Sequence, residues 1–223
     1  LLERSRFPRL MNGVLKLLES AFGVPVDVEF ACQDDRLYIL QCRPLAEFVD
    51  ETLQVDIPSP TRNQTVLFEA SRDIFRSARM DGIRYIVNVD AEAYHRLGSP
   101  AEKLEVARTV GRVNRMLKGS RFIIIGPGRW GSVNIELGVK VTYSDINNAK
   151  ALIEVATEMG GYTPEVSYGT HFFQDLVEAN IVPLPIYPSN GGGLNYDFLR
   201  NSSNILRTLI PEKQAPPDWM DSV

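Results

Sequence analysis

Residues 24–42 read VPVDVEFACQDDRLYILQC, and this stretch decides how the first part of the chain is interpreted. Its first half alternates between apolar residues and the two acids Asp27 and Glu29, which predicts a strand over residues 24–31. The polar run from Gln33 to Arg36 predicts a turn, and the apolar run over residues 37–42 predicts a second strand. The stretch is therefore expected to form a hairpin.

The register of this hairpin determines whether Gln41 lies beside the two acids. Asp27 and Glu29 are two residues apart on a strand, so their side chains point to the same face. Pairing Asp27 with Gln41 and Glu29 with Ile39 gathers the three polar groups, but it needs a five-residue or a tightened three-residue loop. A four-residue loop pairs Val28 with Gln41 and turns the amide to the other face. Together the three side chains would suit Mg²⁺; the alternative is an edge hairpin with a solvated acidic face.

The segments on either side of the hairpin have distinct patterns. Residues 8–22 carry apolar side chains at helical spacing, with Pro8 in the first turn and Gly23 after the last one, which predicts a helix. Residues 46–64 are acidic and then interrupted by Pro58 and Pro60, which is typical of a linker.

Residues 65–223 are expected to form a mixed-sheet, helix-covered domain with a loop-like tail. Strands and helices alternate in the predicted pattern, which favours an α/β or α+β fold. Strands are predicted near residues 65–68, 83–89, 122–125, 133–141 and 181–186. Helices are predicted from the Ser99-Pro100-Ala101-Glu102 capping box to Gly119, from Ser144 or Asp145 to Gly160, and from Thr170 to Asn180.

The composition limits the class of protein. The 223 residues carry 24 Lys+Arg and 28 Asp+Glu, a formal net charge of −4, which disfavours a general binder of nucleic acid or anionic membranes. No apolar run approaches the ~18–20 residues that span a bilayer. Only Cys32 and Cys42 are present, too few for a disulfide framework, so a cytoplasmic location is expected. The chain opens at Leu1 without an initiator Met, which predicts a piece of a longer protein.

The hairpin stretch resembles the end of the nucleotide-binding domain in phosphoenolpyruvate synthase and pyruvate phosphate dikinase. Residues 23–30 (GVPVDVEF) and 37–44 (LYILQCRP) are similar to that family's closing pattern, P-x-D-I-E-[WF] followed by L-Q-x-R-P. The resemblance extends over roughly residues 5 to 45. It implies that residues 1–46 are the C-terminal end of an ATP-grasp domain, followed by a linker over residues 47–64 and an additional α/β domain over residues 65–223.

This resemblance implies part of an ATP-dependent phosphotransferase that uses ATP and Mg²⁺. Asp27, Glu29 and Gln41 would hold Mg²⁺ and the nucleotide phosphates, and Arg43 would contact a phosphate. The family's upstream lysine, arginine and glycine-rich phosphate loop have no counterpart here. The chain alone is therefore expected to be inactive and to need the missing N-terminal part of the same polypeptide. Pyruvate or phosphoenolpyruvate is the implied small-molecule partner, no nucleic acid or membrane is implied, and homodimerisation stays open.

A glycine-rich loop is the second candidate site. Residues 122–132 read FIIIGPGRWGS, which places G-x-G-x-x-G directly after a predicted strand. The alternation over residues 133–141 predicts another strand instead of the helix that a dinucleotide site requires, so a Rossmann interpretation is rejected. The candidate anion-binding residues are Gly126, Gly128, Arg129, Trp130, Gly131 and Ser132.

Each group of this loop has a use in binding. Arg129 suits a phosphate or carboxylate, Trp130 could stack on a base or sugar, and open backbone N–H groups could form an anion nest. A regulatory module that binds such a ligand is the alternative function. A structural hairpin with Trp130 in the core is the other interpretation of the loop.

Residues 164–178 contain the third candidate site. His171, Asp175 and Glu178 lie at helical spacing i, i+4 and i+7, so they share one face. With Glu165 they form a candidate polar cluster for a metal ion or for acid–base chemistry, as in a metal-dependent hydrolase. The alternative is a capped helix with a solvated polar face.

Overall fold

The computed structural model describes residues 7–23, 26–33, 36–44, 59–70, 73–75, 78–158, 164–188 and 193–223. The chain divides into two compact units, Leu1–Glu51 and Thr52–Val223. Within them lie a parallel four-stranded sheet, two antiparallel strand pairs and helices, which confirms the predicted mixed α/β class. Most of the predicted linker falls outside the described residues.

The first unit consists of one helix and one hairpin. Helix α1 spans Phe7–Phe22, and strands β1 (Val26–Gln33) and β2 (Arg36–Pro44) pair antiparallel. The helix ends as predicted, because Gly23 adopts a φ of 73° and its N–H donates to the Glu19 carbonyl at 2.8 Å. The Phe7 and Phe30 rings, 5.2 Å apart between centroids, join the helix to the hairpin.

The second unit is built on a sheet in which every strand runs in the same direction. Its strands are β4 (Tyr85–Asn88), β5 (Phe122–Pro127), β6 (Ala151–Val155) and β7 (Val182–Ile186), in that spatial order. All residues of β5 and β6 are buried, as expected for central strands of a parallel sheet that is covered on both faces.

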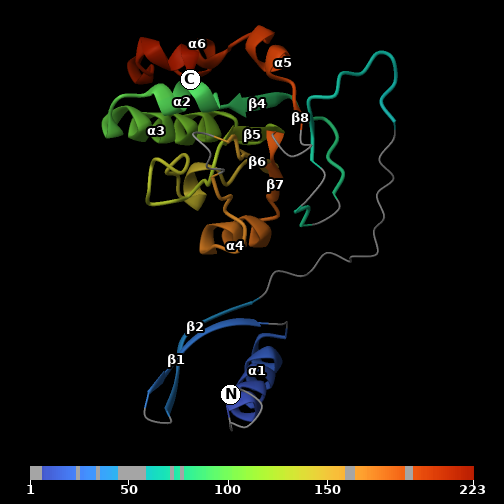
Figure 1. Ribbon diagram of the computed structural model, residues 1–223, viewed down its shortest axis with the longest axis vertical. Coiled ribbons are helices and arrows are strands. Elements are labelled where there is room, and N and C mark those ends of the chain that lie inside the picture. The colour runs from blue at the N-terminus through green and yellow to red at the C-terminus, as the bar shows by residue number, and fades with distance from the viewer. Residues whose placement is uncertain are drawn as a thin grey trace. The chain divides into compact units, whose positions relative to one another are not determined.

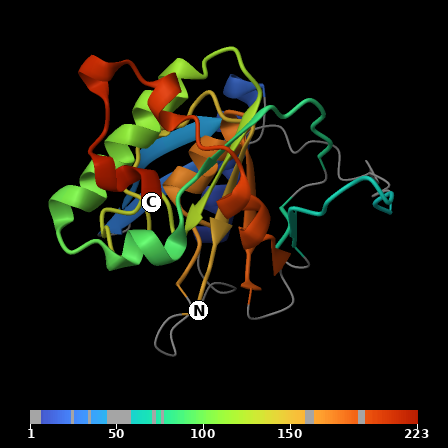
Figure 2. The same cartoon turned by 90° about the horizontal axis from the view of Figure 1, so that it is seen from above.

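Different parts of the chain cover the two faces of this sheet (Figures 1 and 2). Helices α2 (Ala91–Arg96), α3 (Pro100–Met116), α4 (His171–Glu178) and α6 (Leu206–Leu209) pack on one face. The other face is covered by strand β8 (Gly193–Leu194), by helix α5 (Tyr196–Asn201) and by the side chains of Leu67, Phe68, Ala70, Met80 and Ile83. The remaining elements are β3 (Phe68–Glu69), which pairs with β8, and the 3₁₀ turns η2 (Tyr143–Asp145), η4 (Glu212–Gln214) and η5 (Asp218–Ser222).

The predicted N-terminal caps of two helices are confirmed. The Ser99 hydroxyl accepts a hydrogen bond from the Glu102 N–H at 3.3 Å, and the Glu102 carboxylate accepts from the Ser99 N–H at 2.9 Å. Thr170 caps α4 in the same manner, through the Phe173 N–H. No helix among the described residues is long and apolar enough to cross a membrane.

The strand predicted over residues 133–141 is wrong. These residues form a turn-rich loop with a single bridge between Gly128 and Gly138. The Tyr94 hydroxyl lies 3.0 Å from both the Ile135 and the Gly138 carbonyl oxygens, so a side chain satisfies backbone groups that a neighbouring strand would otherwise have paired.

The helix predicted from Ser144 or Asp145 to Gly160 is also wrong. Thr142 and Asp145 form a capping pair, but it opens only the short turn η2. Residues 151–155 then form the buried strand β6. A short apolar run fits either a buried strand or a buried helix segment, and its apolar residues happened to recur at helical spacing.

Candidate functional site

The hairpin of the first unit has a register that the sequence did not predict. Its turn connects the paired residues Gln33 and Arg36, and an irregularity between Glu29 and Phe30 leaves one residue of β2, Leu40, without a partner. Such a bulge changes which residues oppose one another along the rest of the ladder. Continued without it, the pairing would have set Gln41 against Val28, the arrangement that separates the amide from the acids.

The bulge places the predicted ligand residues on one face. Glu29 pairs with Gln41, and Asp27 pairs with Arg43, in place of the Asp27–Gln41 pairing that we expected. Directly opposed residues share a face of the hairpin, and so do residues two apart on one strand. Asp27, Glu29 and Gln41 are half-buried, and for Arg43 only the backbone position is described.

This set of side chains fits a magnesium–nucleotide site in its chemistry. Mg²⁺ prefers oxygen ligands and is usually held by one or two carboxylates together with water and substrate phosphates. Two carboxylates and an amide oxygen supply such ligands from two adjacent strands. Arg43, across from Asp27, is a cation of the kind that binds phosphate with two parallel hydrogen bonds.

The glycine-rich loop of the second unit is internally bonded. The N–H groups of Gly128, Arg129 and Gly131 donate to the carbonyls of Val155, Leu137 and Val139, respectively. The Trp130 N–H donates to the Glu154 carboxylate at 2.9 Å. Residues 128–131 therefore present no open nest of N–H groups to an anion.

The side chains of this loop also pack inward. Trp130 is 1% exposed and lies against Gly126, where an added Cβ would come within 2.5 Å of the indole ring. The ring is thus part of the core and is not available to stack on a ligand. The Ser132 hydroxyl accepts from the Asn134 N–H at 3.1 Å. No helix follows the loop, so the Rossmann interpretation stays rejected, although the strand that we expected in its place is absent.

Two sites that the sequence predicted separately are in contact. The Arg129 guanidinium pairs with the Glu165 carboxylate at 3.3 Å. A Cβ on Gly131 would come within 2.4 Å of the Phe172 ring, so α4 packs directly against the loop. Ligand binding by the loop stays a prediction that now depends on the half-buried Arg129.

Glu154 connects these segments, and the sequence analysis missed it. Its carboxylate accepts hydrogen bonds from the Trp130 N–H at 2.9 Å and from the Ser167 N–H and hydroxyl, both at 2.8 Å. The side chain is 3% exposed, and burial raises its pKa from 4.5 to about 7 against the lowering effect of these donors. The available signal was one acid inside the apolar run ALIEVA of residues 151–156, which was assigned to a helix.

The polar residues of α4 do not form a metal centre. His171, Asp175 and Glu178 lie on the helix as predicted, and Glu165 is exposed near its start. Within the described residues, no group of three or more His, Cys, Asp or Glu side chains could hold a metal ion. Helical spacing aligns these residues along one face, and acid–base chemistry by this cluster stays a prediction.

Comparison with known proteins gives a result for the first part of the chain. Residues 5–63 match the family model of the pyruvate phosphate dikinase AMP/ATP-binding domain. This match supports a pyruvate phosphate dikinase-like family and nucleotide binding by the region that contains the hairpin. Neither the comparison with curated proteins nor the comparison with solved structures found a match.

Proposed function

We propose that the hairpin face formed by Asp27, Glu29, Gln41 and Arg43 binds Mg²⁺ and the phosphates of ATP. In this proposal the protein is an ATP-dependent phosphotransferase that resembles phosphoenolpyruvate synthase and pyruvate phosphate dikinase. The observation that carries it is the bulged register, because that register brings the amide to the face of the two acids. The family match of residues 5–63 supports the same assignment independently.

Each residue has a distinct role in this site. Asp27 and Glu29 supply the negative charge that holds the metal, and Gln41 adds a neutral oxygen opposite Glu29. Arg43 orients and neutralises a phosphate group. Bound Mg²⁺ would neutralise charge on the nucleotide phosphates, and phosphoryl transfer depends mainly on such positioning and charge stabilisation.

The surface of the first unit supports a site that other residues complete. Leu17 is 72% exposed and Leu40 is 64% exposed, and Leu10 and Phe22 are also exposed. Among the described residues of this unit, only Val26 is buried. Apolar patches of this kind mark surfaces that another part of a protein covers. We therefore propose that the rest of an ATP-grasp domain packs here and that the chain alone does not turn over ATP. From the family resemblance, we also propose that pyruvate or phosphoenolpyruvate is the substrate partner.

Calorimetric titration of Mg–ATP into the full-length protein tests the assignment. The double variant Asp27→Ala, Glu29→Ala should bind Mg–ATP at least about tenfold more weakly, because the metal loses both of its charged protein ligands. The matched control is Cys42→Ser, since Cys42 pairs with Val28 on the opposite face and should be neutral. Equal affinity of the double variant and the unmodified protein would refute the proposed site.

A further inference from the structure

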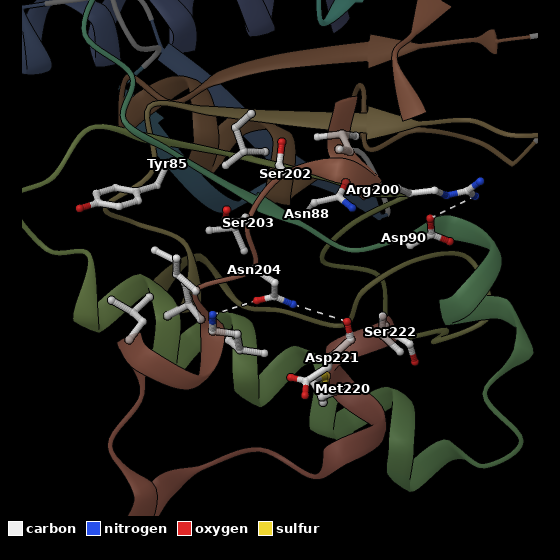
Figure 3. A pocket seen from close by; sticks show the side chains of 18 of the residues that line it. Tyr85, Asn88, Asp90, Arg200, Ser202, Ser203, Asn204, Met220, Asp221 and Ser222 are labelled. Carbon is white, nitrogen blue, oxygen red and sulfur yellow. Dashed lines mark hydrogen bonds and ion pairs between the residues drawn. The ribbon is translucent and has the colours of Figure 1, made fainter. Parts of the chain in front are cut away.

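The second unit contains a cavity of about 840 Å³ that none of the predicted sites includes (Figure 3). It lies beside β4, which is the edge strand of the sheet and has β5 as its neighbour. The opposite wall comes from the segment after α5, and Figure 3 shows Ser202, Ser203 and Asn204 facing it. This cavity therefore occupies the place next to β4 where the sheet stops.

The lining shows that the cavity follows the hydrogen-bonding edge of β4. Five consecutive residues, 84–88, line it, and five more, 202–206, line the other side. Successive side chains of a strand point to opposite faces, so a cavity on one face would touch only alternate residues. A cavity that touches all five runs along the strand edge, between the two sheet faces.

Backbone groups of β4 point into this space. The Val89 N–H, directly after β4, donates to the Ile125 carbonyl, on the β5 side. Because backbone groups alternate in direction along a strand, the N–H and C=O groups of Ile86 and Asn88 are directed away from β5, toward the cavity. At the far end, the Asp90 N–H already donates to the Val223 carbonyl at 2.5 Å. The edge is thus able to make main-chain hydrogen bonds outside the sheet.

The size of the cavity fits one added strand. In an extended chain, Arg84 and Asp90 are ~20 Å apart, and 840 Å³ spread over that length gives a cross-section of about 40 Å². A strand in a packed sheet takes up about 4.8 Å by 10 Å, or about 48 Å². The volume is therefore sufficient for one added strand.

The walls define the chemistry of the occupant. Apolar side chains from α3, α6 and η5 line one side: Val113, Leu117, Leu206, Leu209 and Met220. The charged lining is mostly paired internally. Asp90 and Glu92 contact Arg200 at 3.5 and 3.4 Å, Glu92 also contacts Arg96, and Asp221 contacts Arg207.

Arg84 is the exception among these charges. Within the described part of the chain, no ion pair or side-chain hydrogen bond engages its guanidinium. The cavity therefore has one uncompensated positive charge, at the end where β4 begins.

We propose that this cavity binds an extended peptide segment, which adds to the sheet beside β4. Its main chain pairs with Ile86 and Asn88, its alternate apolar side chains face the wall formed by α3 and α6, and an acidic group lies at Arg84. Strand addition of this kind draws affinity from the main chain and specificity from pockets for alternate side chains.

Selection of peptides from a phage-displayed random heptapeptide library against the 223-residue chain tests the proposal. Enriched peptides should carry alternating apolar residues and at least one Asp or Glu. For a synthetic copy, N-methylation at one set of alternate residues should weaken binding more than tenfold, and at the other set it should have little effect. Arg84→Gln should weaken binding about tenfold, the value of a charge-assisted hydrogen bond. The matched control is Arg115→Gln, because Arg115 is also exposed but lies outside the cavity.

Two further variants distinguish the cavity from other surfaces. Ser203→Trp should fill the space and remove binding. Ile86→Pro should remove the outward N–H without removing a bond to β5, since proline is tolerated on the open side of an edge strand. Absence of enriched peptides, binding unaffected by Ser203→Trp, or insensitivity to N-methylation would each overturn the proposal. A concentration-dependent dimer that Ile86→Pro dissolves would also overturn it, because a second copy would then occupy the edge.

Discussion

Replacement of Glu154 by glutamine should change how the stability of the second unit depends on pH. The Glu154 carboxyl is buried, and its pKa is raised from 4.5 to about 7 in the folded protein. A carboxyl group whose pKa is raised by folding holds its proton more tightly in the native state than in the unfolded state. Ionisation of Glu154 therefore costs stability as the pH rises from 4.5 through 7.

The magnitude follows from the size of the shift. The difference between 4.5 and about 7 corresponds to about 3 kcal/mol, at 1.36 kcal/mol for each pKa unit. The contribution is complete well below pH 4.5 and is lost above pH 7. Glu154→Gln has no ionisable group at this position, so its stability relative to the unmodified chain should rise by about 3 kcal/mol between pH 4 and pH 8.5.

Urea unfolding of both proteins across this pH range, followed by far-ultraviolet circular dichroism, measures the effect. The matched control is Glu158→Gln, an exposed glutamate a few residues along the chain, which should follow the unmodified protein at every pH. A difference between Glu154→Gln and the unmodified chain that stays constant with pH would refute the reasoning. A difference of opposite slope would show that the hydrogen bonds from Trp130 and Ser167 outweigh burial.

Four further substitutions test the loop after β5 and the helices α2 and α3. Gly128→Ala should destabilise the protein by about 3 kcal/mol or more in thermal unfolding, because a Cβ would meet the Leu137 carbonyl oxygen at 1.9 Å and φ is 57°. Tyr94→Phe should cost about 1–3 kcal/mol in the same assay, since buried loop carbonyls lose their hydroxyl partner; no loss would contradict that role. Ser99→Ala should lower the free energy of unfolding by about 1 kcal/mol, because it removes the capping box. The double variant Ser99→Ala, Glu102→Ala should lose no more of this interaction than Ser99→Ala alone.

Local signals were enough to predict the parts of the fold that depend on local chemistry. The Ser99–Glu102 box, the Thr170 cap and Gly23 each act through the backbone of their own helix end, so sequence alone identified them. The strand β6 was missed because its apolar residues also satisfied helical spacing. Its true environment, between β5 and β7, depends on residues far away in the chain.

Long-range packing explains the other errors and omissions. The alternation over residues 133–141 resembled a strand, but Tyr94, about forty residues earlier, took the carbonyls that strand pairing would have used. Glu154 became recognisable only when its partners Trp130 and Ser167 were brought to the end of β6. The cavity beside β4 depends on the path of residues 202–206, which no sequence pattern indicates.

For the hairpin, the sequence indicated the candidate ligand residues but not how they come together. Asp27 and Glu29 share a face by strand geometry alone. The position of Gln41 depends on one bulged residue, and a one-residue change in pairing decides the face of every following side chain. The expected pairing of Asp27 with Gln41 was wrong, because Asp27 pairs with Arg43, two residues further along the strand. A shift of two residues keeps the side chains on the same face of the hairpin but changes which residues lie directly opposite each other.

The most direct test of the central proposal moves the Gln41 amide across the hairpin without changing composition. In the double variant Gln41→Cys, Cys42→Gln, the amide lies opposite Val28, on the face away from Asp27 and Glu29. Its affinity for Mg–ATP in the full-length protein, measured by calorimetry, should equal that of Gln41→Cys alone and be at least about tenfold weaker than that of the unmodified protein. Affinity equal to that of the unmodified protein would contradict a site formed on this face.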